Sequence, residues 1–327
     1  MSFISLSQME LSSIQSLLFI FLISLYIFHF FLIRKPKPTQ TTGFKFYPFV
    51  GTLPDFIQNR HRFLDWSTEV LSLCPTNTAV FRRPGKVHGV ITANPLNVEH
   101  ILKTNFDNYP KGIRFIFYLL PLILAGRDTT SSALTWFFWL LSSRLEIQKK
   151  ILQELETVRT RNAKRTGETY SFDELREMGY LHAAISEAMR LYPPVPVDTK
   201  ACKDDDVLPD GTIVKKDWFV TYHTYAMGRM ESIWGSDCRE FKPERWIENG
   251  TVKQESPFRY PVFHAGPRMC LGKELAYIQM KSIAASVMER FEIDVLNKDK
   301  CPEHLLSLTL RMKGGLPVKV KERYVEA

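Results

Sequence analysis

A run of twenty residues without a formal charge, residues 14–33, constrains this chain more than any other feature of its sequence. At about 1.5 Å per residue, a helix of that length crosses a hydrocarbon layer of roughly 30 Å. The residues before the run include Glu10 and neither Lys nor Arg, whereas a cleaved signal peptide has a basic start and a shorter apolar region. The run therefore predicts one N-terminal transmembrane helix, with residues 1–33 as the membrane anchor.

The excess positive charge of the chain begins directly after this run. The formal net charge is +8, and residues 34–62 contain six Lys or Arg residues and a single acid. Basic residues beside a membrane span favour the cytosolic side, so we expect the body there and no nucleic-acid partner. Pro36 and Pro38 prevent the helix from continuing, which predicts a stiff proline-rich and basic hinge over residues 34–47.

The five cysteines, at positions 74, 202, 238, 270 and 301, are odd in number and widely spaced. No pair has the close spacing of a zinc knuckle or a redox dithiol. This pattern predicts free thiols in a reducing compartment and argues against a zinc protein or a disulfide-bonded scaffold.

The body is predicted to be mainly α-helical with a minor β component. Apolar residues at helical spacing predict the helices, and Pro–Gly or Asp–Gly turns between β-prone runs predict the hairpins. We divide the body into a β-rich N-terminal part, residues 48–112, and a helical part, residues 113–327. The expected helices cover residues 61–73, 95–102, 145–161, 171–191 and 271–291, and the expected hairpins cover residues 79–92 and 207–222.

Residues 113–143 form a second strongly apolar stretch, with a polar interruption that starts at Arg127 and Asp128. A second membrane span would place both charges near the middle of the bilayer, where each costs several kcal/mol. A long helix through a protein core avoids that cost. We therefore expect a buried helix here, kinked or interrupted at Pro121.

The strongest chemical signal is the ten-residue loop FHAGPRMCLG, which ends close to the start of a predicted helix. The positive end of a helix stabilises a thiolate, so Cys270 is well placed to bind a metal, although a cysteine taken alone is more often an inert buried thiol. Gly266 and Gly272 would permit close approach of a flat ligand. Arg268 would meet a carboxylate, and Phe263 would pack beside the sulfur.

Two further patterns gain meaning beside this loop. Glu187 and Arg190 lie one helical turn apart, which by itself is commonly a surface pair, and Arg245 offers a second arginine in a later loop. Asp128 and Thr129 follow a small-residue step in the apolar stretch. That step is either a hydroxyl pair that bends a helix or a groove that admits a diatomic ligand and delivers protons to it.

In their order and spacing, these motifs resemble the cytochrome P450 family of haem-thiolate monooxygenases. The interval from Thr129 to Cys270 is 141 positions, which is normal for that family. The stretches AGRDTTSSALTWFFWLLS and MGRMESIWGSDCREFKPERWI look like those of plant enzymes that hydroxylate fatty acids and long alkanes. The expected fold is a cytochrome P450 fold, and the expected cofactor is haem b.

The resemblance assigns a role to each residue of the motifs. Cys270 would be the axial ligand of the haem iron, Arg268 would contact a propionate, and Phe263, Gly266 and Gly272 would complete the loop around the cofactor. Asp128 and Thr129 would relay protons. The structural ion cluster that supports the loop would consist of Glu187, Arg190 and Arg245.

The resemblance also implies partners and a location. An NADPH-dependent cytochrome P450 reductase would supply electrons, and the substrates would be O2 and a hydrophobic small molecule. The protein would be a single-pass protein of the endoplasmic reticulum bilayer with a cytosolic body.

The chain departs from the family at one point. Residues 108–112 resemble the loop after the family's second helix, and residues from 113 onward resemble its long central helix, so the block between them is missing. That block would hold a tryptophan and an arginine that contact the propionates, and the roof of the substrate pocket. Two rival hypotheses therefore stay open: a non-catalytic, membrane-anchored remnant or mis-spliced product, and a two-span membrane protein without haem.

Overall fold

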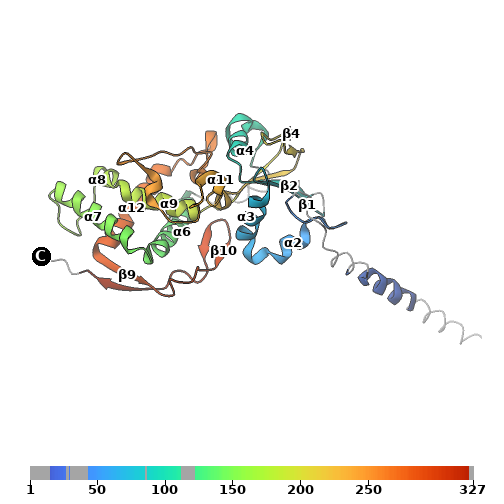
Figure 1. Ribbon diagram of the computed structural model, residues 1–327, viewed down its shortest axis with the longest axis horizontal. Helices are drawn as coiled ribbons and strands as arrows, with labels where there is room; N and C mark the ends of the chain where they lie inside the picture. Colours follow the sequence, from blue (N-terminus) through green and yellow to red (C-terminus); the bar gives the residue numbers. More distant parts are fainter. Residues whose placement is uncertain (1–14, 27–28, 30–42, 85–86, 112–121, 324–327) are drawn as a thin grey trace, which may run out of the picture.

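The computed structural model describes residues 15–26, 29, 43–84, 87–111 and 122–323 (Figure 1). Its helices in the body are α2 (Leu53–Gln58), α3 (Phe63–Leu73), α4 (Pro95–Glu99), α6 (Leu122–Ser142), α7 (Leu145–Arg161), α8 (Phe172–Glu177), α9 (Gly179–Leu191), α10 (Thr224–Met227), α11 (Glu231–Trp234) and α12 (Lys273–Arg290). Short 3-10 or π segments are η1 (Arg60–Arg62), η2 (His100–Thr104), η3 (Phe106–Asn108), η4 (Pro243–Trp246), η5 (Pro261–Phe263) and η6 (Gly266–Arg268). The strands are β1 (Thr78–Arg83), β2 (Val87–Thr92), β3 (Asp198–Ala201), β4 (Asp206–Val207), β5 (Ile213–Val214), β6 (Phe219–Tyr222), β7 (Ile247–Glu248), β8 (Thr251–Val252), β9 (Phe291–Val295), β10 (His304–Leu306), β11 (Leu310–Met312) and β12 (Val318–Glu322). The prediction of a mainly helical body with minor β structure is confirmed.

The largest sheet joins distant parts of the sequence. Its strand order is β1-β2-β6-β3, in which β2 and β6 run parallel and the other neighbours run antiparallel. The predicted hairpin over residues 79–92 supplies β1 and β2, but β6 and β3 come from the part that we assigned to the helical region. The boundary expected at residue 112 therefore does not separate two folding units.

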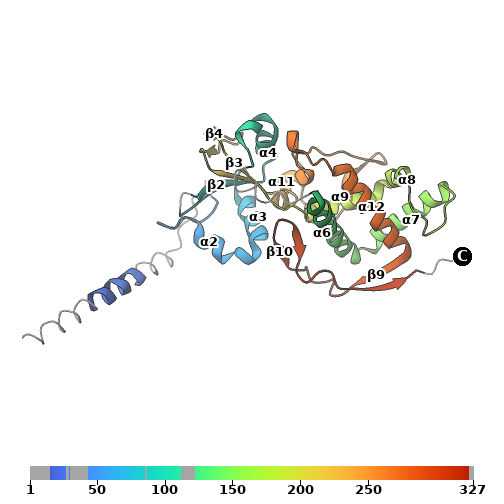
Figure 2. The same cartoon turned by 180° about the vertical axis from the view of Figure 1, so that it is seen from behind.

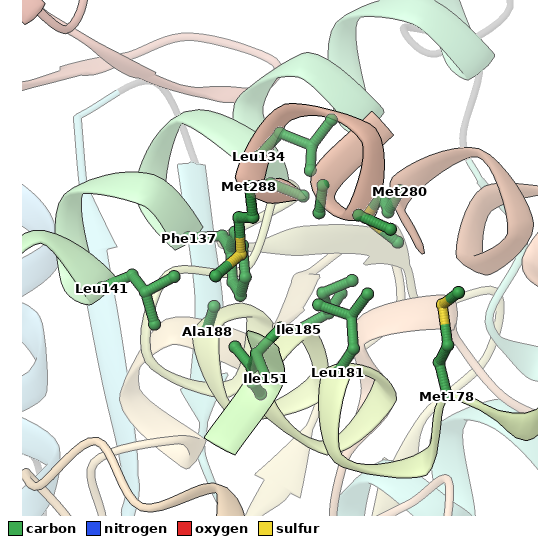
Figure 3. Packing of buried hydrophobic residues seen from close by; sticks show 14 of the residues in the cluster. Leu134, Phe137, Leu141, Ile151, Met178, Leu181, Ile185, Ala188, Met280 and Met288 are labelled. Atoms are coloured by element: carbon green, nitrogen blue, oxygen red, sulfur yellow. The ribbon is translucent and has the colours of Figure 1, made fainter. Parts of the chain in front are cut away.

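The helical part packs around one apolar core to which α6, α7, α9 and α12 all contribute (Figure 3). These helices meet through residues at helical spacing, which explains why each helix can bury one face while its polar face stays in water. Their buried side chains include Leu134, Phe137, Leu141, Ile151, Leu181, Ile185, Ala188, Met280 and Met288.

From Ser132 onward helix α6 is largely buried, as the sequence predicted, whereas Ala125, Gly126 and Arg127 are exposed. Trp136 is fully buried, and its indole N–H donates to the carbonyl oxygen of Leu310 at 2.9 Å. The hydroxyl of Ser132 donates to the same oxygen at 2.7 Å, so β11 is fixed to this helix. The expected kink at Pro121 falls on residues outside the described part of the chain.

The predicted helix over residues 171–191 is wrong in one respect, because it is broken into α8 and α9. Ser171 opens α8 with the expected capping box, in which its hydroxyl accepts the N–H of Glu174. The chain then leaves helical geometry at Met178. The carboxylate of Glu154 accepts the backbone N–H groups of Tyr180 and Leu181 at 2.7 and 2.8 Å, so a side chain from α7 caps the new helix start.

Residues 15–26 form a helix that lies apart from the folded body in two opposite views (Figures 1 and 2). Its apolar side chains are exposed, for example Leu17 at 67% and Phe19 at 65%. Among the described residues, no helix has both the length and the apolar character needed to cross a membrane. The predicted span over residues 14–33 and the hinge over residues 34–47 extend beyond the described residues and stay predictions.

A half-buried ion pair between α7 and α12 makes stability depend on pH. Burial raises the pKa of Glu289, but hydrogen bonds from Arg159 at 2.8 and 2.9 Å and from Tyr170 at 3.0 Å outweigh this and hold it below its usual 4.5. A carboxyl whose folded-state pKa is depressed stabilises the fold above its unfolded pKa and loses that contribution as the pH falls through the folded value. We expect the unfolding temperature to drop below pH 4.5, and to drop less in Glu289→Gln.

The matched control is Glu146→Gln. Glu146 also lies on α7 and pairs with Lys149, but its side chain is 80% exposed. Its removal should leave the acid dependence of the unfolding temperature unchanged. An equal effect of both substitutions would contradict the assignment to Glu289.

Candidate functional site

The cysteine loop folds back on itself before α12. η5 and η6 form two tight turns, and the backbone N–H of Cys270 donates to the carbonyl oxygen of Phe263 at 2.8 Å. α12 begins at Lys273, two residues later than predicted, with Gly272 at its N-cap. Cys270 is one of two exposed cysteines, and all five are free thiols. The loop therefore presents the thiol of Cys270 outward, just before the start of a helix.

Gly266 makes a close contact within the protein that the sequence did not predict. Its φ is +62°, and a Cβ atom there would lie 2.1 Å from the carbonyl oxygen of Leu102 in η2. Glycine is needed here because the backbones of two segments approach closely, and this need exists whether or not a ligand is bound. Gly272 differs, because a Cβ atom there would meet only the sulfur of Cys270, at 3.9 Å. The space beside Gly272 is open.

Arg268 ties the loop to the segment after α4. Its guanidinium donates to the carbonyl oxygen of Tyr109 at 2.8 Å and lies 4.3 Å from the ring centre of Phe106. Within the described part of the chain it forms no ion pair with a carboxylate. Its charge is thus available to an acidic ligand.

Large apolar side chains close to Cys270 in the sequence are uncovered. Leu271 is fully exposed, Leu275 is 56% exposed and Met269 is 44% exposed. Exposure of large apolar side chains to water is unfavourable, because full burial of such a side chain stabilises a protein by roughly 1.5–3 kcal/mol. Phe263 instead packs inward, with its ring centre 5.3 Å from that of Tyr277.

A buried polar network next to the loop was not predicted. The carboxylate of Asp198 accepts hydrogen bonds from Lys200 at 2.5 Å and Tyr222 at 2.7 Å, and Tyr222 hydrogen-bonds with His264 at 2.5 Å. Burial lowers the pKa of Lys200, Asp198 opposes this, and repulsion from Lys111 and Arg268 adds to it. Cations therefore outnumber carboxylates at this edge of the loop. His264 has a positive φ of +59°. Because a backbone angle cannot be read from the sequence, this local feature of the network could not have been found there.

The predicted ion cluster is present and deeply buried. Glu187 and Arg190 are 0% and 1% exposed, and the arginine binds the carboxylate through two nitrogens at 2.7 and 2.8 Å. Arg245 reaches the same carboxylate at 3.4 Å and also binds Asp237 at 2.9 Å. Backbone carbonyls satisfy the rest of Arg190, which donates to Cys238 at 2.6 Å, to Glu240 at 2.9 Å and to Gly228.

The cluster connects to the cysteine loop through aromatic side chains. The indole N–H of Trp246 donates to Glu187 at 2.9 Å, and the Trp246 ring lies 4.6 Å from that of Tyr260. Tyr260 directly precedes η5, and its hydroxyl donates to the carbonyl oxygen of Ser186 at 3.0 Å. The start of the loop is therefore fixed to α9.

Asp128 and Thr129 of α6, the predicted proton-relay residues, have interaction partners of their own. Asp128 pairs with Arg311 of β11 at 2.7 Å, and the Thr129 hydroxyl donates to the carbonyl oxygen of Ala125 at 2.5 Å. The buried hydroxyl of Thr130 has no hydrogen-bond partner among the described residues. In that part of the chain, no hydrogen bond or ion pair links this step to the cysteine loop. Arg311 was not singled out from the sequence, because nothing local marks it as the partner of Asp128.

A sequence model described as Cytochrome P450 matches residues 118–318, which is more than half of the 327 residues. This chain belongs to the cytochrome P450 family. Members of the family bind haem b through a cysteine thiolate and are monooxygenases. The resemblance drawn from the motifs is thereby confirmed.

Curated relatives include several plant cytochromes P450. Cytochrome P450 CYP94D108 of Paris polyphylla is 57% identical over 210 residues, which are 64% of this chain and 42% of that protein. Cytochrome P450 94A2 of Vicia sativa is 52% identical over 213 residues, 63% of this chain and 40% of that protein. The chain thus spans less than half the length of these two relatives.

A longer match shows where length is lost. Cytochrome P450 94B3 of Arabidopsis thaliana is 30% identical over 482 positions, which cover 89% of this chain and 94% of that protein. Because this chain has only 327 residues, at least 155 of those 482 positions have no counterpart in it. The residues that this chain lacks relative to cytochrome P450 94B3 are therefore largely internal, in agreement with the predicted missing block.

Breaking the ion cluster should be costly. Glu187→Gln would leave two arginines beside a neutral amide inside the protein, and removing one partner of a buried ion pair typically costs about 3–5 kcal/mol. We expect the free energy of unfolding of this cytochrome P450, measured by urea titration in mild detergent, to fall by that amount. Glu244→Gln is the control: its carboxylate is 42% exposed and pairs with Lys150, so the loss should stay below about 1 kcal/mol. Equal losses would refute the special role of Glu187.

Proposed function

We propose that this chain binds haem b with Cys270 as the axial ligand of the iron and acts as a monooxygenase on a hydrophobic molecule. The observation that carries the proposal is the cysteine loop, in which an exposed thiol stands among uncovered apolar side chains just before a helix. When bound, the haem would supply the activation of O2. The protein would supply position, environment and protons.

The residues beside the loop suit this cofactor in both shape and charge. Leu271 and Leu275 provide apolar surface that a porphyrin ring would cover. Arg268, which lacks a carboxylate partner in the described part of the chain, would face a propionate. The space left by Gly272 allows a flat group to approach the sulfur closely. Gly266 would act indirectly, by fixing the loop to η2.

Proton delivery would depend on α6. Asp128 and Thr129 would pass protons to the oxygen-binding side of the site, and Arg311 would hold the Asp128 carboxylate in place through the ion pair at 2.7 Å. The Thr130 hydroxyl, buried without a partner among the described residues, would be free to hydrogen-bond with water or substrate.

The substrate class, electron donor and location follow from the family resemblance. We propose aliphatic hydroxylation of fatty acids or alkanes, with electrons from an NADPH-dependent cytochrome P450 reductase. The exposed apolar helix over residues 15–26 and the basic residues after it support an anchor in the endoplasmic reticulum membrane with the body on the cytosolic side.

A second candidate function has its own observation. Because at least 155 positions of the 94B3 match have no counterpart here, much of the usual pocket wall and roof would be missing. The chain would then be a membrane-anchored protein that lacks turnover, or the product of a mis-spliced transcript. Full-length transcript sequencing separates these cases, since a longer message would show that the gap arises in processing.

Haem binding is tested by a carbon monoxide difference spectrum of the dithionite-reduced protein in microsomes. We expect the red-shifted band typical of thiolate-bound haem in the unmodified chain and its complete loss in Cys270→Ala. The matched control is Cys301→Ala, which removes the other exposed cysteine and should keep the band. If the protein is present in the membrane without this band, the monooxygenase proposal fails and the second candidate remains.

Membrane anchoring is tested by deleting residues 1–33. Alkaline carbonate strips peripheral proteins from microsomes but leaves membrane-spanning ones, so we expect the full chain in the pellet and the shortened chain mostly in the supernatant. Protease added to sealed microsomes should digest the C-terminus of the full chain. A protected C-terminus would support the two-span alternative.

A further inference from the structure

A cavity of about 450 Å³ opens beside the cysteine loop, between α9, α12 and the segment after β8. This volume is within the usual range for small-molecule sites, roughly 300–1,000 Å³. The loop contributes Phe263, His264 and Met269 to its wall, while Cys270 is not among the lining residues. The proposed iron ligand therefore does not line this cavity.

Three basic side chains meet in this cavity: His182 from α9 and Lys273 and Lys281 from α12. Lys281 is only 5% exposed, and its amine donates to the carbonyl oxygen of Leu175. Within the described residues, neither lysine has a carboxylate within 4.0 Å, and the ring nitrogens of His182 make no hydrogen bond. Buried cations without a counter-ion are unfavourable, and a bound anion would relieve that cost.

The acids that line the cavity form no ion pair with these groups in the described part of the chain. Glu255 is already shared between Lys253 and Arg259, each at 3.1 Å. Glu274 is exposed and forms no ion pair in the described part of the chain. At the rim, the guanidinium of Arg176 faces Asp173 at 3.6 Å. The interior of the cavity is thus left with a positive balance.

His182 lies close enough to Lys273 and Lys281 for their charges to act on it. Burial, and after it the positive charges of Lys281 and Lys273, lower the pKa of His182 to about 4. Burial likewise lowers the pKa of Lys281, although Glu154 and Glu274 oppose this. Both shifts agree with the geometry, since His182 and Lys281 are largely enclosed and lie near other positive charges.

The wall next to His182 is aromatic and polar. The His182 ring stacks on Tyr277 with ring centres 4.0 Å apart and an angle of 19° between the planes. The Tyr277 hydroxyl hydrogen-bonds with Ser186 at 2.9 Å. The cavity thus offers room and contacts for an organic body next to the basic groups.

We propose that this cavity binds a small organic phosphate, with the phosphate group among Lys273, Lys281 and His182. Two ammonium groups and a ring nitrogen can donate to several phosphate oxygens at once, and lysine is a common phosphate ligand. The cavity is larger than a phosphate ion, so the organic part occupies the side formed by α9 and Tyr277. The inference goes beyond the proposed function and does not require bound haem.

Pyridoxal 5′-phosphate is a suitable probe because its phosphate sits beside an aldehyde. A neutral lysine amine condenses with the aldehyde to an imine and releases water. Added borohydride then transfers hydride to the imine carbon, and water protonates the nitrogen, which leaves a stable secondary amine. Peptide mass mapping of the full chain locates the label. We expect Lys273 or Lys281 to be labelled severalfold ahead of Lys149, whose side chain is 65% exposed.

Competition and a substitution complete the test. Inorganic phosphate should protect the cavity lysines and leave the labelling of Lys149 unchanged. His182→Phe keeps a ring beside Tyr277 but removes a hydrogen-bond partner of the phosphate, so about tenfold more phosphate should be needed for the same protection. An unchanged unfolding temperature would show that this variant folds.

Two outcomes would overturn the inference. The first is labelling of Lys273 and Lys281 no faster than that of Lys149, without protection by phosphate. The second is labelling concentrated at Lys111 or Lys200, which lie beside the cysteine loop. Neither depends on the carbon monoxide spectrum, so failure of the phosphate site and failure of haem binding can be told apart.

Discussion

The carboxylate of Glu187 is the interaction on which the rest of the helical part depends. It accepts hydrogen bonds from two side-chain nitrogens of Arg190, from the backbone N–H of Lys242, and from side-chain nitrogens of Arg245 and Trp246. A fully buried carboxylate is tolerable only when such partners surround it. Because those partners come from α9, η4 and the chain just before η4, satisfying one charge fixes three segments. Trp246 and Tyr260 connect these segments to the start of the cysteine loop.

Helix α9 borders two different environments. One face of α9 contributes Leu181, Ile185 and Ala188 to the apolar core, and the other carries the ion cluster. His182 and Ser186, at the start of the helix and one turn on, line the cavity beside the loop. Displacing α9 would therefore disturb core packing, loop position and cavity shape together.

Patterns within a short stretch of sequence predicted the structure well. The helix α7 has the predicted bounds, the capping box at Ser171 is present, and Glu187, Arg190 and Arg245 meet as expected. The first two depend on neighbours within one or two helical turns, so the sequence contains all the information needed. The ion cluster was predicted through its resemblance to a family, since no local rule brings Arg245 to α9.

Features that depend on distant residues escaped prediction. The break between α8 and α9 is fixed by Glu154 of a different helix, and the backbone approach at Gly266 involves Leu102. The pairing of Asp128 with Arg311 joins positions 183 residues apart. None of these partners leaves a periodic or spacing signal in its own stretch. The roles of Phe263, Arg268, Cys270 and Thr129 toward a cofactor stay predictions for the experiments above.

The parallel pairing of β2 with β6 has a consequence for how this chain matures. During synthesis, residues 87–92 emerge long before residues 219–222, so the inner edge of β2 has no partner while more than a hundred residues are added. Pairings of such high sequence separation form slowly, and an open strand edge can join another chain in the meantime. Several ribosomes that translate one messenger RNA would bring such edges close to one another. Its yield in the cell should therefore depend on chaperones that cover that edge until β6 arrives.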